Sequence, residues 1–195
     1  DAREAVLGFD GYRNVYATWP QSDGVRDVVW SNRFDADAGR WQDAGRAETS
    51  STGSAANVRL TVSWSGDLVA VWHETDAGLS NIWANRYVAS LGRWEDAGLI
   101  ETSSAGNAEA PDVKADNWGN VTAVWSQHTG SRKAVFANRF SAAAGRWGDA
   151  GIIDTESTGD SHGVRVGMDN AGNAVAVWSR DLGGQSTIWA NRYVA

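Results

Sequence analysis

One apolar segment recurs four times along the chain at a constant interval. The segment "IWANRYVA" occupies residues 82–89 and again residues 188–195, and looser copies, "VWSNRFDA" and "VFANRFSA", begin at Val29 and Val135. Each copy contains an Asn-Arg pair, and the four Asn residues stand 53 residues apart, at Asn32, Asn85, Asn138 and Asn191. A unit of this length is too short to bury a core alone, so the repeat predicts stacked supersecondary units.

Within each unit the apolar residues alternate with a period of two, and Val, Ile, Trp and Tyr dominate them. This pattern is typical of β-strands. In the third unit the strands are expected at residues 111–115, 121–127, 135–140 and 147–153. The intervening "DNWGN", "HTGSRK" and "SAAAG" segments contain the Gly and Asn residues that tight turns use. Four short antiparallel strands per unit indicate a propeller blade, so the sequence predicts an all-β, four-bladed β-propeller.

The whole chain, residues 1–195, is expected to form this one domain, with repeats at residues 1–53, 54–106, 107–159 and 160–195. The last repeat contains no "GRW" segment, so its blade is expected to lack the outer strand. The Asn-Arg strand of that blade would then expose unpaired backbone groups, which another strand can pair with. Self-association through this open edge is therefore expected.

Composition excludes several partners. The net charge of −7 disfavours nucleic acid, whose phosphates require clustered Lys and Arg. No run approaches the roughly 18 apolar residues of a membrane span, so no membrane insertion is expected. The chain contains no Cys, which excludes disulfides and thiolate metal sites. We expect no cofactor and no metal site.

The "D-x-x-G-N" turn followed by an apolar strand resembles the blade pattern of several bacterial propeller families, including sialidase-like repeats. The "GNA-AVW" and "IWANRY" segments resemble tandem repeats of secreted or surface bacterial proteins, and this resemblance covers nearly the whole chain. It implies that the strand around "PDVKAD" is innermost and "GRW" outermost in a blade. It also implies a secreted or cell-surface location, and it identifies no catalytic residue.

The repeated Arg residues are expected to form ion pairs within each blade. A short loop between the third and fourth strands would set each Arg directly opposite an Asp, on the same face and about 5 Å away. A guanidinium can bind a carboxylate there with two hydrogen bonds. The predicted structural ion pairs are Arg33 with Asp43, Arg86 with Asp96, and Arg139 with Asp149.

Two other repeated positions predict structural roles. One Trp in each second strand is expected to fill the space between neighbouring blades, at Trp19, Trp72, Trp125 and Trp178. An Asp opens three of the turns between the first and second strands, where it can accept hydrogen bonds from backbone N–H groups. These residues are Asp10, Asp116 and Asp169.

Binding is expected where the repeats differ. The loop after the second strand reads "PQSDGVRD", "HETDAGLS", "SQHTGSRK" and "SRDLGGQS", so its chemistry changes on a constant frame, which is a common layout for a binding surface. Aromatic residues near the first turn provide further platforms for a ligand. The candidate ligand-binding residues are Tyr12, Trp64, Trp118, His73, Glu74, His128, Arg132, Arg180 and Asp181.

These features favour a non-catalytic, lectin-like module that binds glycan between blades through aromatic faces and polar side chains. The alternative is a protein-interaction or adhesive repeat that binds a surface protein, and a second alternative is a glycosidase-like enzyme. The sequence contains no recognised nucleophile motif, phosphate loop or metal-ligand spacing. From this we expect no catalytic residue and no enzymatic activity.

Overall fold

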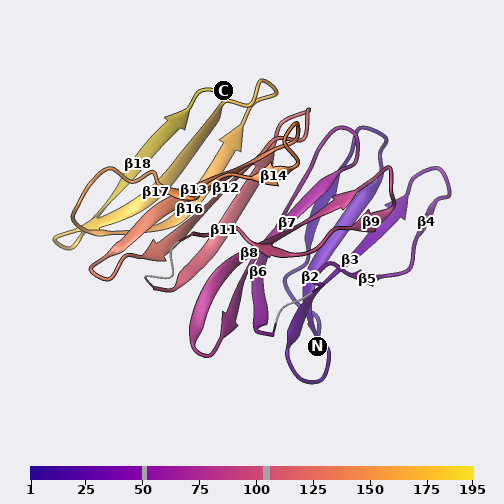
Figure 1. Cartoon of the computed structure of the whole chain (residues 1–195), viewed down its shortest axis with the longest axis horizontal. Helices are drawn as coiled ribbons and strands as arrows, with labels where there is room; N and C mark the ends of the chain where they lie inside the picture. The colour runs from indigo at the N-terminus through magenta and orange to yellow at the C-terminus, as the bar shows by residue number, and fades with distance from the viewer. Residues whose placement is uncertain (50–51, 103–105) are drawn as a thin grey trace.

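The computed structural model describes residues 1–49, 52–102 and 106–195. These residues form strands and turns without any helix, so they contain no helix that could span a membrane. The strands make four antiparallel sheets, one after another along the chain (Figure 1). The predicted all-β class is therefore confirmed.

Each sheet is built from consecutive strands. The first contains β1 (Val6–Phe9), β2 (Val15–Ser22), β3 (Asp27–Asp35), β4 (Arg40–Trp41) and β5 (Gly45–Arg46). The second contains β6 (Ser54–Val62), β7 (Leu68–Asp76), β8 (Leu79–Val88), β9 (Arg93–Trp94) and β10 (Gly98–Leu99). The third contains β11 (Ala108–Ala115), β12 (Val121–His128), β13 (Lys133–Ser141), β14 (Arg146–Trp147) and β15 (Gly151–Ile152). The fourth contains β16 (Asp160–Met168), β17 (Ala174–Leu182) and β18 (Gln185–Tyr193).

Strand order within the sheets follows the expected order from first strand to "GRW" segment. The outer strand differs in detail, because it is two short pieces that pair separately with the third strand. In the third sheet Trp147 lies opposite Phe140, whereas Ile152 lies opposite Phe136. The described part of the fourth sheet has three strands, which leaves β18 at its edge.

First strands of neighbouring sheets lie next to each other where the sheets converge. The Ala115 N–H donates to Thr61 Oγ1 at 2.9 Å, and the Val166 N–H donates to Asp112 Oδ2 at 2.9 Å. The first strands of the second, third and fourth sheets also share a bulge at the same repeat position. A residue with positive φ marks this position in every repeat, at Glu4, Asn57, Ala110 and Gly163.

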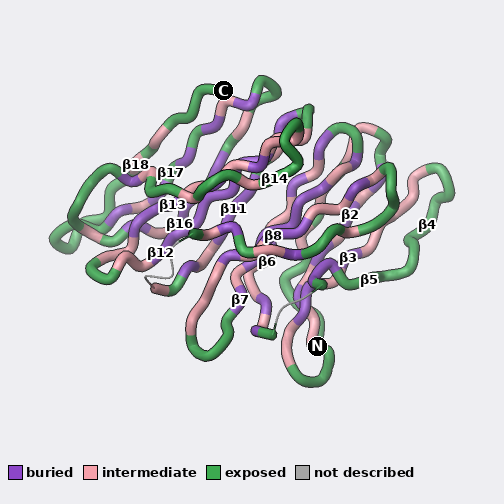
Figure 2. The backbone as a smooth tube through the Cα atoms, viewed as in Figure 1, coloured by how far each residue is buried: buried purple, intermediate pink, exposed green. Residues whose placement is uncertain are grey.

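A separate apolar core fills each of the three junctions between neighbouring sheets. Figure 2 shows the buried stretches along the strands and the exposed ones mainly at the turns and outer loops. Trp72, Trp125 and Trp178 are buried in these junctions, which confirms the predicted role of the repeated Trp. Trp19 is only half-buried, because no other sheet among the described residues packs against this face of the first sheet.

The four sheets form an arc in which the first and fourth sheets lie at opposite ends of the molecule (Figure 1). In the described ranges, each of the three core clusters joins two consecutive sheets, and none joins the fourth sheet to the first. This arrangement differs from the closed ring expected from the sequence. Each end of the arc therefore has one sheet face without a neighbouring sheet.

The predicted ion pairs of Arg33 with Asp43, Arg86 with Asp96, and Arg139 with Asp149 are wrong. The register between β3 and β4 sets Phe34 opposite Trp41, one residue away from the expected alignment. The Gln42 N–H then donates to the Arg33 carbonyl at 2.9 Å. The same register holds in the second and third sheets. In each sheet the residue before the Asp, and not the Asp itself, therefore lies opposite the Arg.

Arg86 and Arg139 instead lie at the junction with the following sheet, where each contacts an aromatic ring of that sheet. Arg86 pairs with Asp67 at 2.6 Å and lies over the Phe140 ring of the next sheet, 5.5 Å from its centroid. Arg139 lies 3.8 Å from the centroid of the Tyr193 ring in the same way. A cation over an aromatic face is stabilising, so these two Arg residues help to join the sheets.

The repeated Asn crosses the junction in the other direction. Its side-chain amide donates to a backbone carbonyl at the end of the preceding repeat. Asn85 donates to the Ala47 carbonyl at 2.6 Å, Asn138 to the Ile100 carbonyl at 2.7 Å, and Asn191 to the Ile153 carbonyl at 2.8 Å. The repeated Asn-Arg pair is thus a structural connector between sheets.

Candidate functional site

The turns between first and second strands lie at one end of the sheets, which we call the turn end. Asp10 organises the first of these turns, because its Oδ1 accepts hydrogen bonds from the N–H groups of Tyr12 at 2.8 Å and Asn14 at 2.9 Å. Asp116 and Asp169 form the same pair of bonds in their sheets. The predicted turn role of these three Asp residues is therefore confirmed.

A groove runs between the first and second sheets at the turn end. It consists of two adjoining cavities of about 120 and 160 Å³, which share Tyr16, Arg33 and Tyr87. Asp10, Tyr12, Asn14, Ser65 and Ala89 complete the first cavity, and Asn32, Gln42, Asp43, Arg93 and Trp94 are among the residues that complete the second. We refer to these two cavities as the tyrosine groove.

Tyr16 distinguishes this junction from the other two. The equivalent position holds Val69 in the second sheet and Thr122 in the third. The Tyr16 hydroxyl lies 3.3 Å from Asp10 Oδ2. Burial, together with the negative charge of Asp10, raises the pKa of Tyr16 to about 12. The hydroxyl therefore stays protonated and can donate to Asp10.

The walls of the groove combine aromatic rings with the side chains of Arg33 and Arg93. The Tyr87 ring lies 6.0 Å from the Tyr16 ring and 5.7 Å from the Trp94 ring, centroid to centroid. Arg33 pairs with Asp35 at 3.3 Å, and its Nε is covered and has no hydrogen-bond partner among the described residues. The groove thus offers apolar faces and hydrogen-bond donors within one junction.

Of the aromatic residues predicted to bind ligand, the structure brings Tyr12 into this groove. Trp64 lies beside it, because the Trp64 ring packs against Gly11 at a place where a Cβ would clash with the ring. Trp118 occupies the position equivalent to Tyr12 in the third sheet, where its side chain is exposed. It lines neither cavity of the tyrosine groove.

The loops after the second strands lie at the opposite end of the sheets, together with the links between repeats. This arrangement is fixed by bonds between repeats, such as the Lys133 N–H to Asp160 Oδ1 at 2.8 Å and the Ser80 N–H to Asn107 Oδ1 at 3.0 Å. His128 borders a cavity of about 310 Å³ here, with Leu79, Gly106, Asn107, Glu109 and Lys133. This cavity holds none of the other predicted ligand-binding residues.

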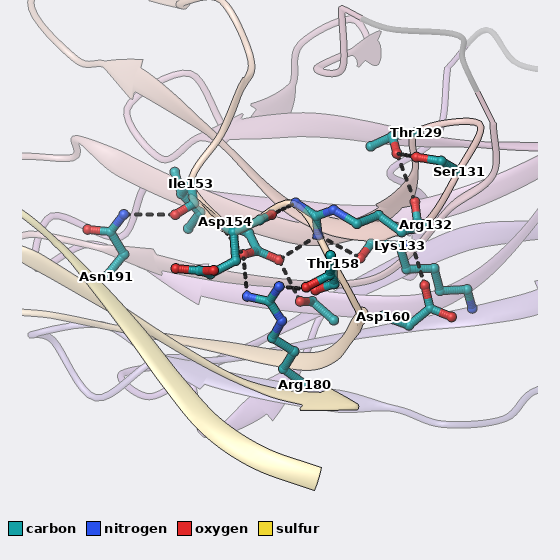
Figure 3. A network of polar contacts seen from close by, with 12 residues as sticks. Thr129, Ser131, Arg132, Lys133, Ile153, Asp154, Thr158, Asp160, Arg180 and Asn191 are labelled. Carbon is teal, nitrogen blue, oxygen red and sulfur yellow. Dashed lines mark hydrogen bonds and ion pairs between the residues drawn. The ribbon is translucent and has the colours of Figure 1, made fainter. Parts of the chain in front are cut away.

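Arg132 and Arg180 are part of the junction between the third and fourth sheets. Figure 3 shows both guanidinium groups converging on Asp154, with NH1 distances to its carboxylate of 2.9 Å for Arg132 and 3.5 Å for Arg180. Arg180 also donates to the Thr158 carbonyl and has no exposed surface. The prediction that Arg180 binds a ligand is therefore wrong, because its side chain is buried in the protein.

The remaining predicted residues are dispersed. Glu74 is buried and accepts hydrogen bonds from the Gly53 N–H at 2.8 Å and from Trp72 Nε1 at 3.4 Å. The prediction that Glu74 binds a ligand is therefore wrong. Burial lowers the pKa of His73. Asp181 lies 3.8 Å from His162 on the fourth sheet. These residues form no common site.

Tyr16, Tyr87 and Trp94 were not predicted from the sequence as site residues, and Arg33 was predicted to form a structural pair. One signal was present, since Tyr16 stands where the other repeats have Val or Thr. The neighbours of Tyr16 could not be read from the repeat, because the tyrosine groove forms across a junction between two repeats.

No family model and no curated protein matches the chain. Solved structures do share its fold. One is a protein of unknown function from Dyadobacter fermentans, with 11% identity, 97% of this chain and 65% of that chain covered, and a TM-score of 0.66. An endo-arabinase from Bacteroides thetaiotaomicron has 18% identity, 100% and 74% coverage, and a TM-score of 0.53. A sialidase from Streptococcus pneumoniae has 9% identity, 95% and 30% coverage, and a TM-score of 0.59.

At these identities the likeness shows a propeller-type fold and no more. It nevertheless overturns one prediction made from the sequence. We expected no enzyme, because no catalytic motif was recognised. The structures that share the fold include an endo-arabinase, a family-43 glycoside hydrolase and a polysaccharide lyase. Catalysis is therefore among the uses of this fold, and the missing motif does not exclude it.

Proposed function

We propose that this chain is a carbohydrate-recognising propeller in which the four sheets are consecutive blades and the tyrosine groove binds sugar. The observation that carries the proposal is the composition of that groove. It sets the rings of Tyr16, Tyr87 and Trp94 beside the Arg33 guanidinium, with Tyr12 exposed at its rim. Support also comes from structural neighbours whose names refer to arabinan, fructan and sialic acid chemistry. A secreted or surface location is part of the same proposal.

The chemistry of the groove suits a sugar ring. The apolar C–H face of a pyranose or furanose can pack on an aromatic ring, and its hydroxyl groups need donors and acceptors around the edge. Arg33 supplies donors only, whereas the Ser65 hydroxyl and the Asn14 amide supply both. A neutral or acidic glycan therefore fits better than a basic ligand.

An array of arabinan, fructan and sialylated glycans, followed by calorimetry on the best binder, tests the proposal. Replacing the exposed Tyr12 with Ala should weaken binding by at least about tenfold, which is about 1.4 kcal/mol. Trp118→Ala is the matched control, because it removes an equally exposed aromatic from the equivalent turn of another sheet: the exposed fractions are 62% and 78%. Equal effects of the two variants, or no glycan binding at all, would contradict the proposal.

Cleavage of the bound glycan is the second candidate. The observation in its favour is that two carboxylates, Asp10 and Asp43, line the groove, since glycoside hydrolysis commonly uses a pair of carboxyl groups. Asp10 is held by the turn, whereas Asp43 lies in an exposed segment. Release of reducing ends from the bound glycan, lost in Asp43→Asn, would establish cleavage. Binding of the glycan without release of cleavage products would support recognition and contradict cleavage.

A further inference from the structure

The two ends of the arc carry faces that are buried everywhere else in the molecule. On the fourth sheet the open face includes Val177 and Ile188, which are 40% and 77% exposed. The equivalent residues of the third sheet, Val124 and Val135, are buried against the fourth. The open face thus has the composition of an interior junction surface without a partner sheet.

The first sheet presents the opposite half of such a junction. Leu7 and Phe9 on its outer face are 59% and 65% exposed. Val113 and Val166, which are equivalent to Leu7, are buried. Trp19 lies on the same face, and its three equivalents fill the junctions between sheets. This is the kind of face that the fourth sheet would meet if the arc continued.

The two open faces are also complementary in their polar contacts. Arg86 and Arg139 each lie over an aromatic ring of the following sheet. Arg192 is their equivalent in the fourth sheet, and the aromatic residue at the matching position of the first sheet is Phe34. A junction between these sheets would place the Arg192 guanidinium over the Phe34 ring, as in the second and third junctions of the chain.

We propose that the open face of the fourth sheet binds the open face of the first sheet of a second copy of this chain, head to tail. The shape of the arc keeps the two faces of one copy at opposite ends, so they are available to other copies (Figure 1). The junctions inside the chain show which surfaces fit together. At each of them, the face equivalent to the one that bears Val177 and Ile188 packs against the face equivalent to the one that bears Leu7, Phe9 and Trp19. Such a contact is heterologous, so it closes into a ring or grows into a filament, depending on the rotation per copy.

Sedimentation velocity over a range of concentrations tests this interface. The wild-type chain should associate, and Ile188→Asp or Leu7→Asp alone should weaken association by at least about tenfold, because each buries an unpaired carboxylate. Both residues are exposed in one copy, so the fold should be retained, as circular dichroism would verify. Leu99→Asp is the matched control, because Leu99 is 53% exposed on a short outer strand away from both faces. It should leave association unchanged.

A mixture of the two variants gives a sharper result. Ile188→Asp retains the first-sheet face and Leu7→Asp retains the fourth-sheet face, so equal amounts should form a dimer of the two variants and nothing larger. A wild-type chain that stays monomeric at all concentrations would overturn the proposal. Association that tolerates Leu7→Asp would also overturn it and would point to pairing through the β18 edge. Equal weakening by Leu99→Asp would indicate non-specific contact.

Discussion

Among the described residues, Glu101 has no cationic partner, unlike the residues at its position in the other two junctions. The equivalent Glu48 lies 2.5 Å from Arg26, and Asp154 lies 2.9 Å from Arg132. At the position of these Arg residues the second repeat has Leu79. Burial raises the pKa of Glu101 to about 7, and its Oε2 is covered and has no hydrogen-bond partner among the described residues. Ionisation of this carboxyl group should therefore destabilise the fold.

The sign and size of the effect follow from the two pKa values. The folded protein holds the Glu101 proton more tightly than the unfolded chain, whose ordinary value is 4.5, so stability should fall as the pH rises from about 4.5 to about 7. The whole shift corresponds to about 3 kcal/mol. Because the side chain is partly exposed, we expect roughly 1–2 kcal/mol. Glu101→Gln removes this loss, so the variant should be more stable than wild type by that amount at pH 8.

Urea denaturation at pH 4 and pH 8 measures this difference. At pH 4 the wild type and Glu101→Gln should have similar free energies of unfolding, because Glu101 is then largely protonated in both states. Leu79→Arg should also stabilise the chain at pH 8, since it restores the partner that Glu48 has in Arg26. Asp96→Asn is the control, because Asp96 is an exposed carboxylate beside the same sheet and forms no ion pair among the described residues. An equal effect of Glu101→Gln at both pH values would show that ionisation of Glu101 does not destabilise the fold.

Two further predictions concern backbone strain and the Asn connectors. Ala110 has a φ of +51°, so Ala110→Gly should raise the free energy of unfolding by about 0.5–1 kcal/mol, and Gly163→Ala, at the equivalent bulge of the fourth sheet, should lower it. Opposite signs in a urea titration confirm this, and equal signs contradict it. Asn138→Ala removes bonds to the Ile100 and Gly148 carbonyls and should cost about 2 kcal/mol. Asn32→Ala, which removes no bond across a junction, should cost less than half of that, and an equal loss would count against the connector role.

Much of the fold could be predicted because every repeat carries the same pattern of apolar and turn residues and therefore forms the same strands and turns. A period of two gives strands, the turn residues end them, and a 53-residue interval gives one sheet per unit. The ion pairs could not be predicted as reliably, because they depend on the register across one short loop. A shift of one residue moves every side chain to the other face of the strand. The actual alignment sets Phe34 opposite Trp41, and that single step removed all three predicted pairs.

The shared bulge was hidden for a different reason. Asn57 and Gly163 are residue types that favour positive φ, whereas Glu4 and Ala110 are not, so the repeats share no consistent turn signal there. The tyrosine groove was hidden because its walls come from two repeats. Tyr16 and Tyr87 are 71 positions apart, which is not a multiple of the repeat, so aligning the units on each other does not bring them together.

Residues that differ between repeats set the chemistry of each junction, while the repeated Asn keeps the backbone contact constant. At the third junction Asp154 is buried, which alone would raise its pKa, but hydrogen bonds from Ser161 and Arg132 outweigh burial and lower it. That junction should therefore lose stability as the pH falls through the lowered pKa. The second junction, with Leu79 and Glu101, should lose stability as the pH rises toward 7. Opposite pH responses in junctions with the same backbone contact mean that this fold can vary the chemistry between its sheets without altering the contacts that hold them together.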